Sequence, residues 1–253
     1  MLTDEQRHLF ATNGFVVVPG VVDHELLRSA DAEVDELVAR SPAPAGSVGP
    51  HFHFLRPDQL PAADAALRSS GALSLANELV APHHLDHALG YIQVALNIPP
   101  HRHRPGAPHI DGHRPDEEIG SFTMLAAVFL SDESLPDRGN LWVWPGSHRG
   151  HQQLFRERGV DVLKDVSGHA FMLVPPVWLG PGEPLLAKRG DLLLAHFLLG
   201  HNTGGNTTAA TRRVLYYRLA TESHLEHWSD TFVDFLTEYP SLRLAVGPGN
   251  ATV

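Results

Sequence analysis

Short apolar or alternating runs, separated by Pro and Gly, fill the chain from residue 91 to residue 220, and this pattern limits the fold most strongly. In chain order the runs read YIQVALNI, HIDGH, SFTMLAAVFL, NLWVWP, AFMLV, DLLLAHF and RRVLYYRLA. Runs of this length between such breaks are typical of β-strands. Many short strands in succession predict a closed β structure of the jelly-roll type.

Before residue 91 the apolar residues have mainly helical spacing. We predict helices over residues 3–12, 23–39 and 63–79, a strand over 15–20, and a last helix over 229–239 before a tail of 240–253. Thr3 and Asp23 precede the first two helices and are typical N-caps, because their side-chain oxygens can accept from free backbone N–H groups of the first turn. Gly71 weakens the third helix.

Helices followed by many strands predict an α+β fold, mainly β, with a double-stranded β-helix (jelly-roll, cupin-like) core and N-terminal helices packed on one sheet. Residues 1–253 fit a single domain, since no Ser/Gly linker, charge block, repeat or low-complexity tract divides them. The most Pro-rich stretch, residues 40–54, is interpreted as a loop.

Composition and charge argue against several classes of protein. The formal net charge of −10 disfavours nucleic acid as a partner, because such binding depends on Lys and Arg that neutralise phosphates. The sequence has no Cys, so disulfides, thiolate catalysis and Cys-type zinc sites are excluded. No signal peptide or membrane-spanning apolar run is visible. We therefore expect a cytoplasmic protein that acts on a small molecule, with its oligomeric state left open.

Three residues have the spacing of a metal centre. His109 and Asp111 are two apart in HIDGH, so on an extended strand both side chains leave the same face. His201, 92 residues after His109, can join them from a second strand. Two imidazoles and one carboxylate leave the opposite positions of the metal open, which suits a non-haem Fe(II) centre that binds a cosubstrate and O2.

The motifs around these residues follow one another in a characteristic order. LTDEQRHLFATNGFVVVPGVVDHELL stands near the N-terminus, followed by PHIDGH, RGNLWVWPGSHRG and RGDLLLAHFLLGHNTGGNTTAATRRVLYYRL. In this order they resemble the opening helix and strand, the HxD strand, the PGSH segment and the last strand pair of the phytanoyl-CoA dioxygenase-like Fe(II)/2-oxoglutarate oxygenases. The resemblance covers nearly the whole chain and implies that His109, Asp111 and His201 are the metal ligands and the catalytic centre.

The resemblance also implies a set of residues that bind the cosubstrate. Arg212 follows His201 by 11 residues, where the family holds the far carboxylate of 2-oxoglutarate, and Thr203 corresponds to a Ser or Thr that supports it. Gln93 and Asn97, on the strand before HxD, are similar to further cosubstrate contacts. Arg213 alternates to the opposite face and is expected to be structural.

The reaction implied by the resemblance is oxidation with Fe(II), O2 and 2-oxoglutarate, which leaves as succinate and CO2. Hydroxylation of a small organic metabolite is the leading interpretation. Desaturation, cyclisation or epimerisation at the same site is an alternative, and so is a non-catalytic cupin-like binding domain. A zinc hydrolase is disfavoured, because no HExxH or comparable general-base motif is present.

The primary substrate is the least constrained feature. A CoA ester would bring phosphates that call for clustered Lys and Arg. The one local basic concentration supplies three arginines beside the HxD strand, and His113 is a further candidate pocket residue: Arg102, Arg104, Arg114 and His113. We expect a small polar or amphipathic metabolite that enters between the 40–54 and 98–108 loops.

Eighteen His are many for this length, and two further clusters could in principle bind a metal. HHLDHA at 83–88 is more typical of a solvated helix end, and His224 and His227 of an ordinary helix.

Overall fold

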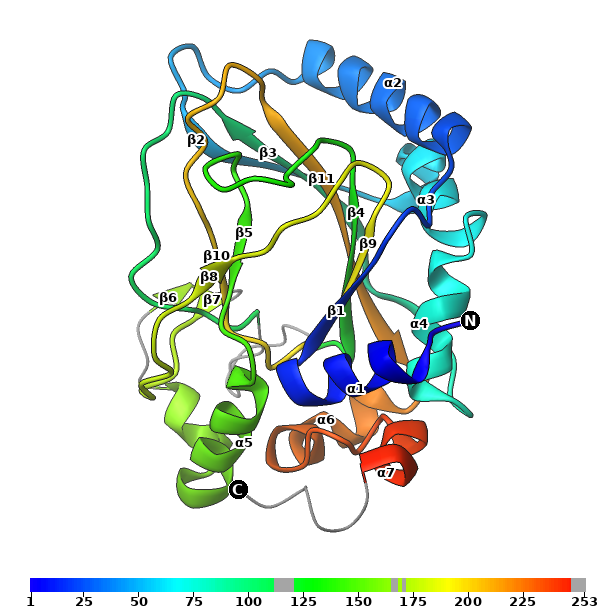
Figure 1. The fold of residues 1–253 in the computed structure, drawn as a ribbon, viewed down its shortest axis with the longest axis vertical. Helices are drawn as coiled ribbons and strands as arrows, with labels where there is room; N and C mark the ends of the chain where they lie inside the picture. The colour runs from blue at the N-terminus through cyan, green and yellow to red at the C-terminus, as the bar shows by residue number, and fades with distance from the viewer. Residues whose placement is uncertain (112–120, 165–167, 170–171, 247–253) are drawn as a thin grey trace.

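Two facing antiparallel sheets form the centre of the molecule (Figure 1). The computed structural model describes residues 1–111, 121–164, 168–169 and 172–246. The larger sheet has six strands in the order β1-β9-β4-β11-β3-β2, and the smaller sheet has the order β10-β5-β8. One apolar cluster contains Leu125 and Leu193 of the larger sheet together with Leu141 and Val143 of the smaller one, so side chains of both sheets fill the space between them.

Most of the strands coincide with the apolar runs of the sequence. The larger sheet contains β1 (Phe15–Val18), β2 (Gly49–Leu55), β3 (Leu85–Ile98), β4 (Met124–Phe129), β9 (Leu192–His196) and β11 (Arg212–Thr221). The smaller sheet contains β5 (Leu141–Val143), β8 (Glu183–Pro184) and β10 (His201–Thr203). A separate pair joins β6 (Gly168–His169) to β7 (Met172–Leu173).

N-terminal helices cover the outer side of the larger sheet, except that the first of them lies across its lower end (Figure 1). They are α1 (Asp4–Asn13), α2 (His24–Arg40), α3 (Pro61–Arg68) and α4 (Ala72–Val80), with a short 3-10 turn η1 (Pro57–Gln59) before α3. Thr3 caps α1 in a capping box, and Asp23 accepts from two backbone N–H groups of α2, as expected. Gly71, at φ +90°, divides the predicted 63–79 helix into two.

Alternation along the strands separates two layers of core. On β4, Met124, Ala126 and Val128 face the helices, whereas Leu125 and Ala127 face the smaller sheet. Because both faces of this central strand are covered, all six of its residues are buried.

Helices of the C-terminal half depart from the expectation. They are α5 (Ser147–Arg158), the 3-10 turn η2 (Val160–Lys164), α6 (His224–Val233) and α7 (Pro240–Val246). No helix was expected at α5, the last predicted helix begins five residues earlier than residue 229, and α7 lies in the predicted tail. None of the helices in the described residues is long and apolar enough to cross a membrane.

Two predictions on the N-terminal half were wrong. The 40–54 segment is not wholly a loop, because its end forms the edge strand β2, which pairs with β3 from Gly49↔Ile98 to Leu55↔Ile92. The 83–88 cluster does not form a helix, since β3 begins at Leu85 and the 83–84 pair precedes it.

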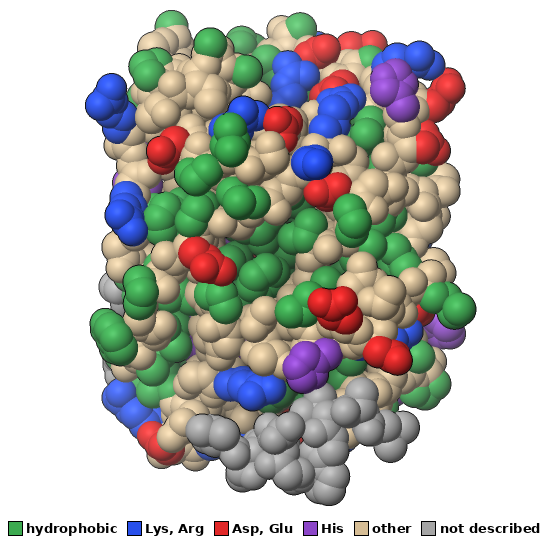
Figure 2. Space-filling view, in the orientation of Figure 1, with side chains coloured by type: hydrophobic (Ala, Val, Ile, Leu, Met, Phe, Trp, Pro, Cys, Tyr) green, Lys and Arg blue, Asp and Glu red, His purple; other side chains and the backbone are tan. Residues whose placement is uncertain are grey.

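Charged residues of both signs are mixed at the upper end of the molecule, over α2, and hydrophobic side chains gather in the middle of the same face (Figure 2).

On α2, Asp35 and Asp31 lie 2.7 and 3.6 Å from Arg213. Arg213 thus lies on the helix side of the sheet, as its alternation with Arg212 predicted.

Candidate metal centre

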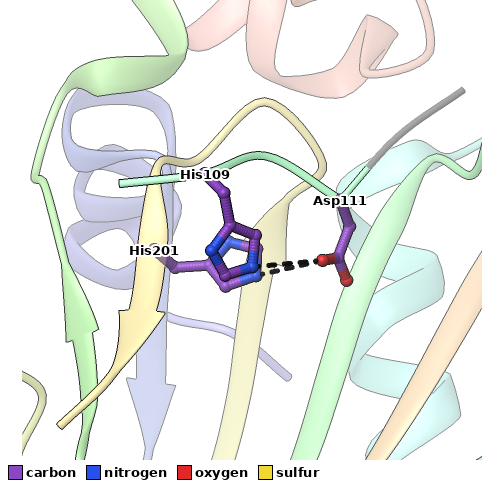
Figure 3. A group of neighbouring side chains, drawn as sticks. All are labelled: His109, Asp111 and His201. Carbon is purple, nitrogen blue, oxygen red and sulfur yellow. Dashed lines mark ion pairs between the residues drawn. The ribbon is translucent and has the colours of Figure 1, made fainter. Parts of the chain in front are cut away.

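Backbone pairing brings the three predicted metal ligands together. His109 and His201 exchange two backbone hydrogen bonds of 2.9 Å, which join the HxD segment directly to β10. Their rings lie 4.5 Å apart, and both Nε2 atoms point at the same carboxylate oxygen (Figure 3). Asp111 Oδ1 is 3.5 Å from Nε2 of His109 and 3.4 Å from Nε2 of His201. One atom from each side chain lies within 4.8 Å of the others, a spacing that a single metal ion can bridge.

This triad is the one cluster of three or more potential His, Cys, Asp or Glu ligands within the described part of the chain. A second metal site among the 83–88 residues, or around His224, therefore has no support. His224 is instead fully buried, with Nδ1 2.7 Å from Glu238.

The surroundings of the triad favour the protonation states that bind a metal. Burial alone would raise the pKa of Asp111, but Arg218 and the two imidazoles hold that pKa well below its usual range. Burial, and then the neighbouring His201, lower the pKa of His109. The Nδ1–H of His201 donates to the carbonyl of Leu199 at 2.9 Å, which directs Nε2 towards the carboxylate.

Arg218 is a site residue that the sequence analysis missed. Its Nη2 contacts Asp111 Oδ2, and its Nη1 donates to Gln93 Oε1 at 2.7 Å. The guanidinium also lies over the rings of Tyr91 and Phe122, at 5.9 and 5.7 Å. Because Arg218 occupies Oδ2, Asp111 presents its other oxygen to the two imidazoles.

Arg212 lies in the same cavity as the triad and is held by two buried side chains. Its Nε donates to Glu133 Oε1 at 2.9 Å, and its Nη2 donates to the Tyr216 hydroxyl at 2.8 Å. These bonds use two of the five N–H groups of the guanidinium. Gly139, at φ +84°, lets the preceding loop approach, since a Cβ there would lie 2.9 Å from Cβ of Arg212.

Glu133, also missed from the sequence, is completely buried beside Arg212. Burial raises the pKa of its carboxyl to about 7, and the ion pair with Arg212 opposes that rise. Its charge therefore changes within the physiological pH range.

The remaining predicted cosubstrate residues lie in different surroundings. Thr203 and Gln93 line the cavity, Thr203 from β10 and Gln93 from β3. Asn97 is fully buried, does not belong to the cavity lining, and donates from Nδ2 to the carbonyl of Gly204 at 2.8 Å. Asn97 thus braces the loop after β10.

The cavity has a volume of about 770 Å³ and extends from the triad to β2 and the segment after β3. His101 and His103 line it from that segment, whereas the predicted Arg102 and Arg104 are exposed outside the lining. Arg104 lies over the ring of Trp142, 5.3 Å from its centroid. His113 and Arg114 lie outside the described residues.

The sequence profile of the phytanoyl-CoA dioxygenase (PhyH) family matches residues 10–214. No curated protein sequence matches the chain significantly.

Several solved structures share the fold. HygX from Streptomyces hygroscopicus, with nickel and 2-oxoglutarate bound, is 21% identical over 88% of each chain, with a TM-score of 0.60. The epimerase SnoN, in complex with Fe3+, α-ketoglutarate and nogalamycin RO, is 20% identical over 86% of this chain and 82% of that one, with a TM-score of 0.61. The carbocyclase SnoK from nogalamycin biosynthesis is 16% identical over 89% of this chain and 90% of that one, with a TM-score of 0.59. The predicted fold class is confirmed.

Proposed function

The chain belongs to the phytanoyl-CoA dioxygenase family of Fe(II)/2-oxoglutarate-dependent enzymes, and we propose that it hydroxylates a small organic molecule. The observation that carries this proposal is the placement of the His109–Asp111–His201 triad and Arg212 in one cavity. A metal site and a cation for a dicarboxylate then face the same space.

The side chains present fit an Fe(II) ion. Two imidazole nitrogens and one carboxylate oxygen form the donor set that non-haem Fe(II) oxygenases use. His109, Asp111 and His201 would hold the metal on one side. With Oδ2 of Asp111 engaged by Arg218, the carboxylate offers one oxygen, so three ligand atoms leave the other positions free.

Arg212 and Thr203 would bind the far carboxylate of 2-oxoglutarate. Glu133 and Tyr216 orient the guanidinium, which leaves further N–H groups for a paired contact with two carboxylate oxygens. Gln93 supports the site indirectly, since its side-chain oxygen accepts from Arg218.

When bound, Fe(II) with 2-oxoglutarate and O2 supplies the oxidising power of the reaction, and 2-oxoglutarate is released as succinate and CO2. The protein contributes orientation and the exclusion of water: His201 is 8% exposed, Asp111 5% and Arg212 3%.

The test is a substrate screen with purified protein, Fe(II) and 2-oxoglutarate, read by succinate formation and by the mass of the product. Hydroxylation adds one oxygen, desaturation or oxidative cyclisation removes two hydrogens, and epimerisation leaves the mass unchanged. The Asp111→Ala variant is the matched control for iron-dependent succinate. If no succinate forms under any condition, including slow turnover without a substrate, the non-catalytic alternative is favoured instead.

A further inference from the structure

The outer part of the cavity has an apolar wall on one edge strand. The side chains of β2 alternate, so that Pro50, Phe52 and Phe54 line the cavity while the intervening residues do not. Phe52 is 39% exposed and Phe54 54%. Large apolar side chains that remain exposed together are typical of a binding surface.

The rings of this wall contact one another. Phe54 packs edge-on against Tyr91 of β3 with ring centroids 5.2 Å apart, and lies 6.4 Å from Phe52. Two stacked imidazoles, His101 and His103, 5.5 Å apart, also line the cavity, and His101 lies beside Gly49 at the start of β2. Burial, and then the neighbouring His103, lower the pKa of His101, so this ring favours its neutral form. Five rings therefore line this part of the cavity.

Strand register separates this wall from the cosubstrate residues. Pro50 pairs with Asn97 and Asn97 with Arg212, while Phe54 pairs with Gln93 and Gln93 with Tyr216. The wall thus lies two strands from β11, at roughly 10 Å for a strand spacing of about 4.8 Å. A molecule bound against β2 can reach the triad without occupying the place of 2-oxoglutarate.

Charge is confined to the inner part of the cavity. Among the described lining residues, the Asp and Arg side chains are Asp111, Arg212 and Arg218, and no Lys or Glu takes part. Both arginines are already paired with carboxylates. Within the described lining, the outer part offers neither the cations that phosphates require nor the carboxylates that a polyamine would require.

We infer that the β2 wall binds a flat, uncharged, fused-ring portion of the primary substrate, an inference that rests on the proposed function. Phe52 and Phe54 stack on this portion, and the reacting carbon extends towards the triad. This class of molecule is narrower than the small polar or amphipathic metabolite expected from the sequence. The cavity volume of about 770 Å³ suits it, since pockets for drug-sized ligands span roughly 300–1,000 Å³.

The test uses 9-anthracenemethanol, an uncharged fluorescent molecule with three fused rings. Binding is measured by fluorescence anisotropy to protein loaded with Zn(II) and 2-oxoglutarate, and also to metal-free protein. Phe52→Leu and Phe54→Leu keep apolar volume but remove a ring, so each is expected to weaken binding about 3- to 10-fold. Leu135→Ala removes an equally exposed apolar side chain outside the cavity and should leave binding unchanged.

Competition identifies the class of ligand. Decan-1-ol, decanoyl-CoA and kanamycin A are each expected to displace the anthracene poorly. Absence of anthracene binding, unchanged binding in both Phe variants, or displacement by any competitor below the Kd of the anthracene would overturn the inference. Because binding is measured without turnover, a failure of the succinate assay alone would count against the proposed function and not against this wall.

Discussion

Arg218 provides a sharp test of how the metal centre is built, through its replacement by Met. In the metal-free protein this change leaves Asp111 buried without its cationic partner, since the two side chains are only 8% and 6% exposed. Removal of one member of a buried ion pair typically costs about 3–5 kcal/mol in the free energy of unfolding. For a domain of this size the corresponding fall in Tm is roughly 6–20 °C.

A bound divalent ion should reduce that cost, because it supplies a new counter-charge at the other oxygen of Asp111. The remaining loss is then the hydrogen bond to Gln93 and the contacts with two aromatic rings, about 1–2 kcal/mol in all. The assay is denaturant unfolding followed by circular dichroism, with chelator or with saturating Zn(II). The wild-type and Arg218→Met proteins should differ much less with Zn(II) than with chelator.

Arg213 is the matched control, because it lies on the same strand but on the opposite face and pairs with Asp31 and Asp35 of α2, whose side chains are 25% and 63% exposed. Arg213→Met should cost at most about 1 kcal/mol, with or without metal. Arg218→Lys keeps the charge and gives an intermediate measurement if the Met variant does not fold. An equal Arg218→Met deficit in chelator and in Zn(II) would refute the view that Arg218 and the metal share Asp111.

Three further predictions concern the same site. Replacing His109 or His201 with Ala should abolish Fe(II) binding, measured by metal analysis, and should also abolish succinate formation. The circular dichroism spectrum should be preserved. A variant that retains iron and turnover would contradict the assignment of the triad as the metal ligands. Arg212→Ala should raise the KM for 2-oxoglutarate roughly 30- to 1000-fold, because a charge-assisted buried contact is worth about 2–4 kcal/mol. Arg213→Ala should leave this KM unchanged. The reverse ranking would show that Arg213 binds the cosubstrate. Burial raises the pKa of Glu133 to about 7, so its negative charge develops as the pH rises through that value. This charge offsets that of Arg212 and should increase the KM for 2-oxoglutarate. Glu133→Gln should make the KM less dependent on pH, and a KM that falls as the pH rises would contradict the assignment. Because the folded-state pKa of Glu133 lies above its ordinary value of 4.5, its contribution to the free energy of unfolding is present below pH 4.5 and is lost as the pH rises towards 7.

Features set by local interactions were predictable from the sequence. The caps at Thr3 and Asp23 act within one turn, so residues close in the chain determine where α1 and α2 begin. Gly71 interrupts a helical pattern through its own backbone conformation. The two-residue spacing of His109 and Asp111 likewise places both side chains on one face.

Features set by distant contacts were not predictable in the same way. Tertiary contacts fix the C-terminal helices: His224 at the start of α6 is tied to Glu238, and Leu242 of α7 is fully buried. The edge strand β2 owes its structure to pairing with β3, which a Pro- and Gly-rich sequence conceals. Each of these contacts joins segments that a local pattern does not connect.

Two functional side chains illustrate the same limit. Glu133 reaches Arg212 across 79 residues, and no local signal marks it. Arg218 reaches Asp111 across 107 residues, but it did carry a signal: it lies six residues after Arg212 on an alternating strand, and so has the same parity. Parity along a strand that already contains a site residue could therefore have identified Arg218.

The separation of the β2 wall from the triad has a consequence for how such an enzyme can be redesigned. The wall belongs to the edge of one sheet, whereas His201 belongs to the other sheet and is paired directly with the HxD segment. Side chains at positions 50 and 52 can thus be exchanged without touching the ligands or the helices, whereas Phe54 packs on Tyr91, which lies against Arg218. A combinatorial library at positions 50 and 52 would vary which molecules are accepted while the residues around the metal centre stay constant, so that selectivity and chemistry evolve independently.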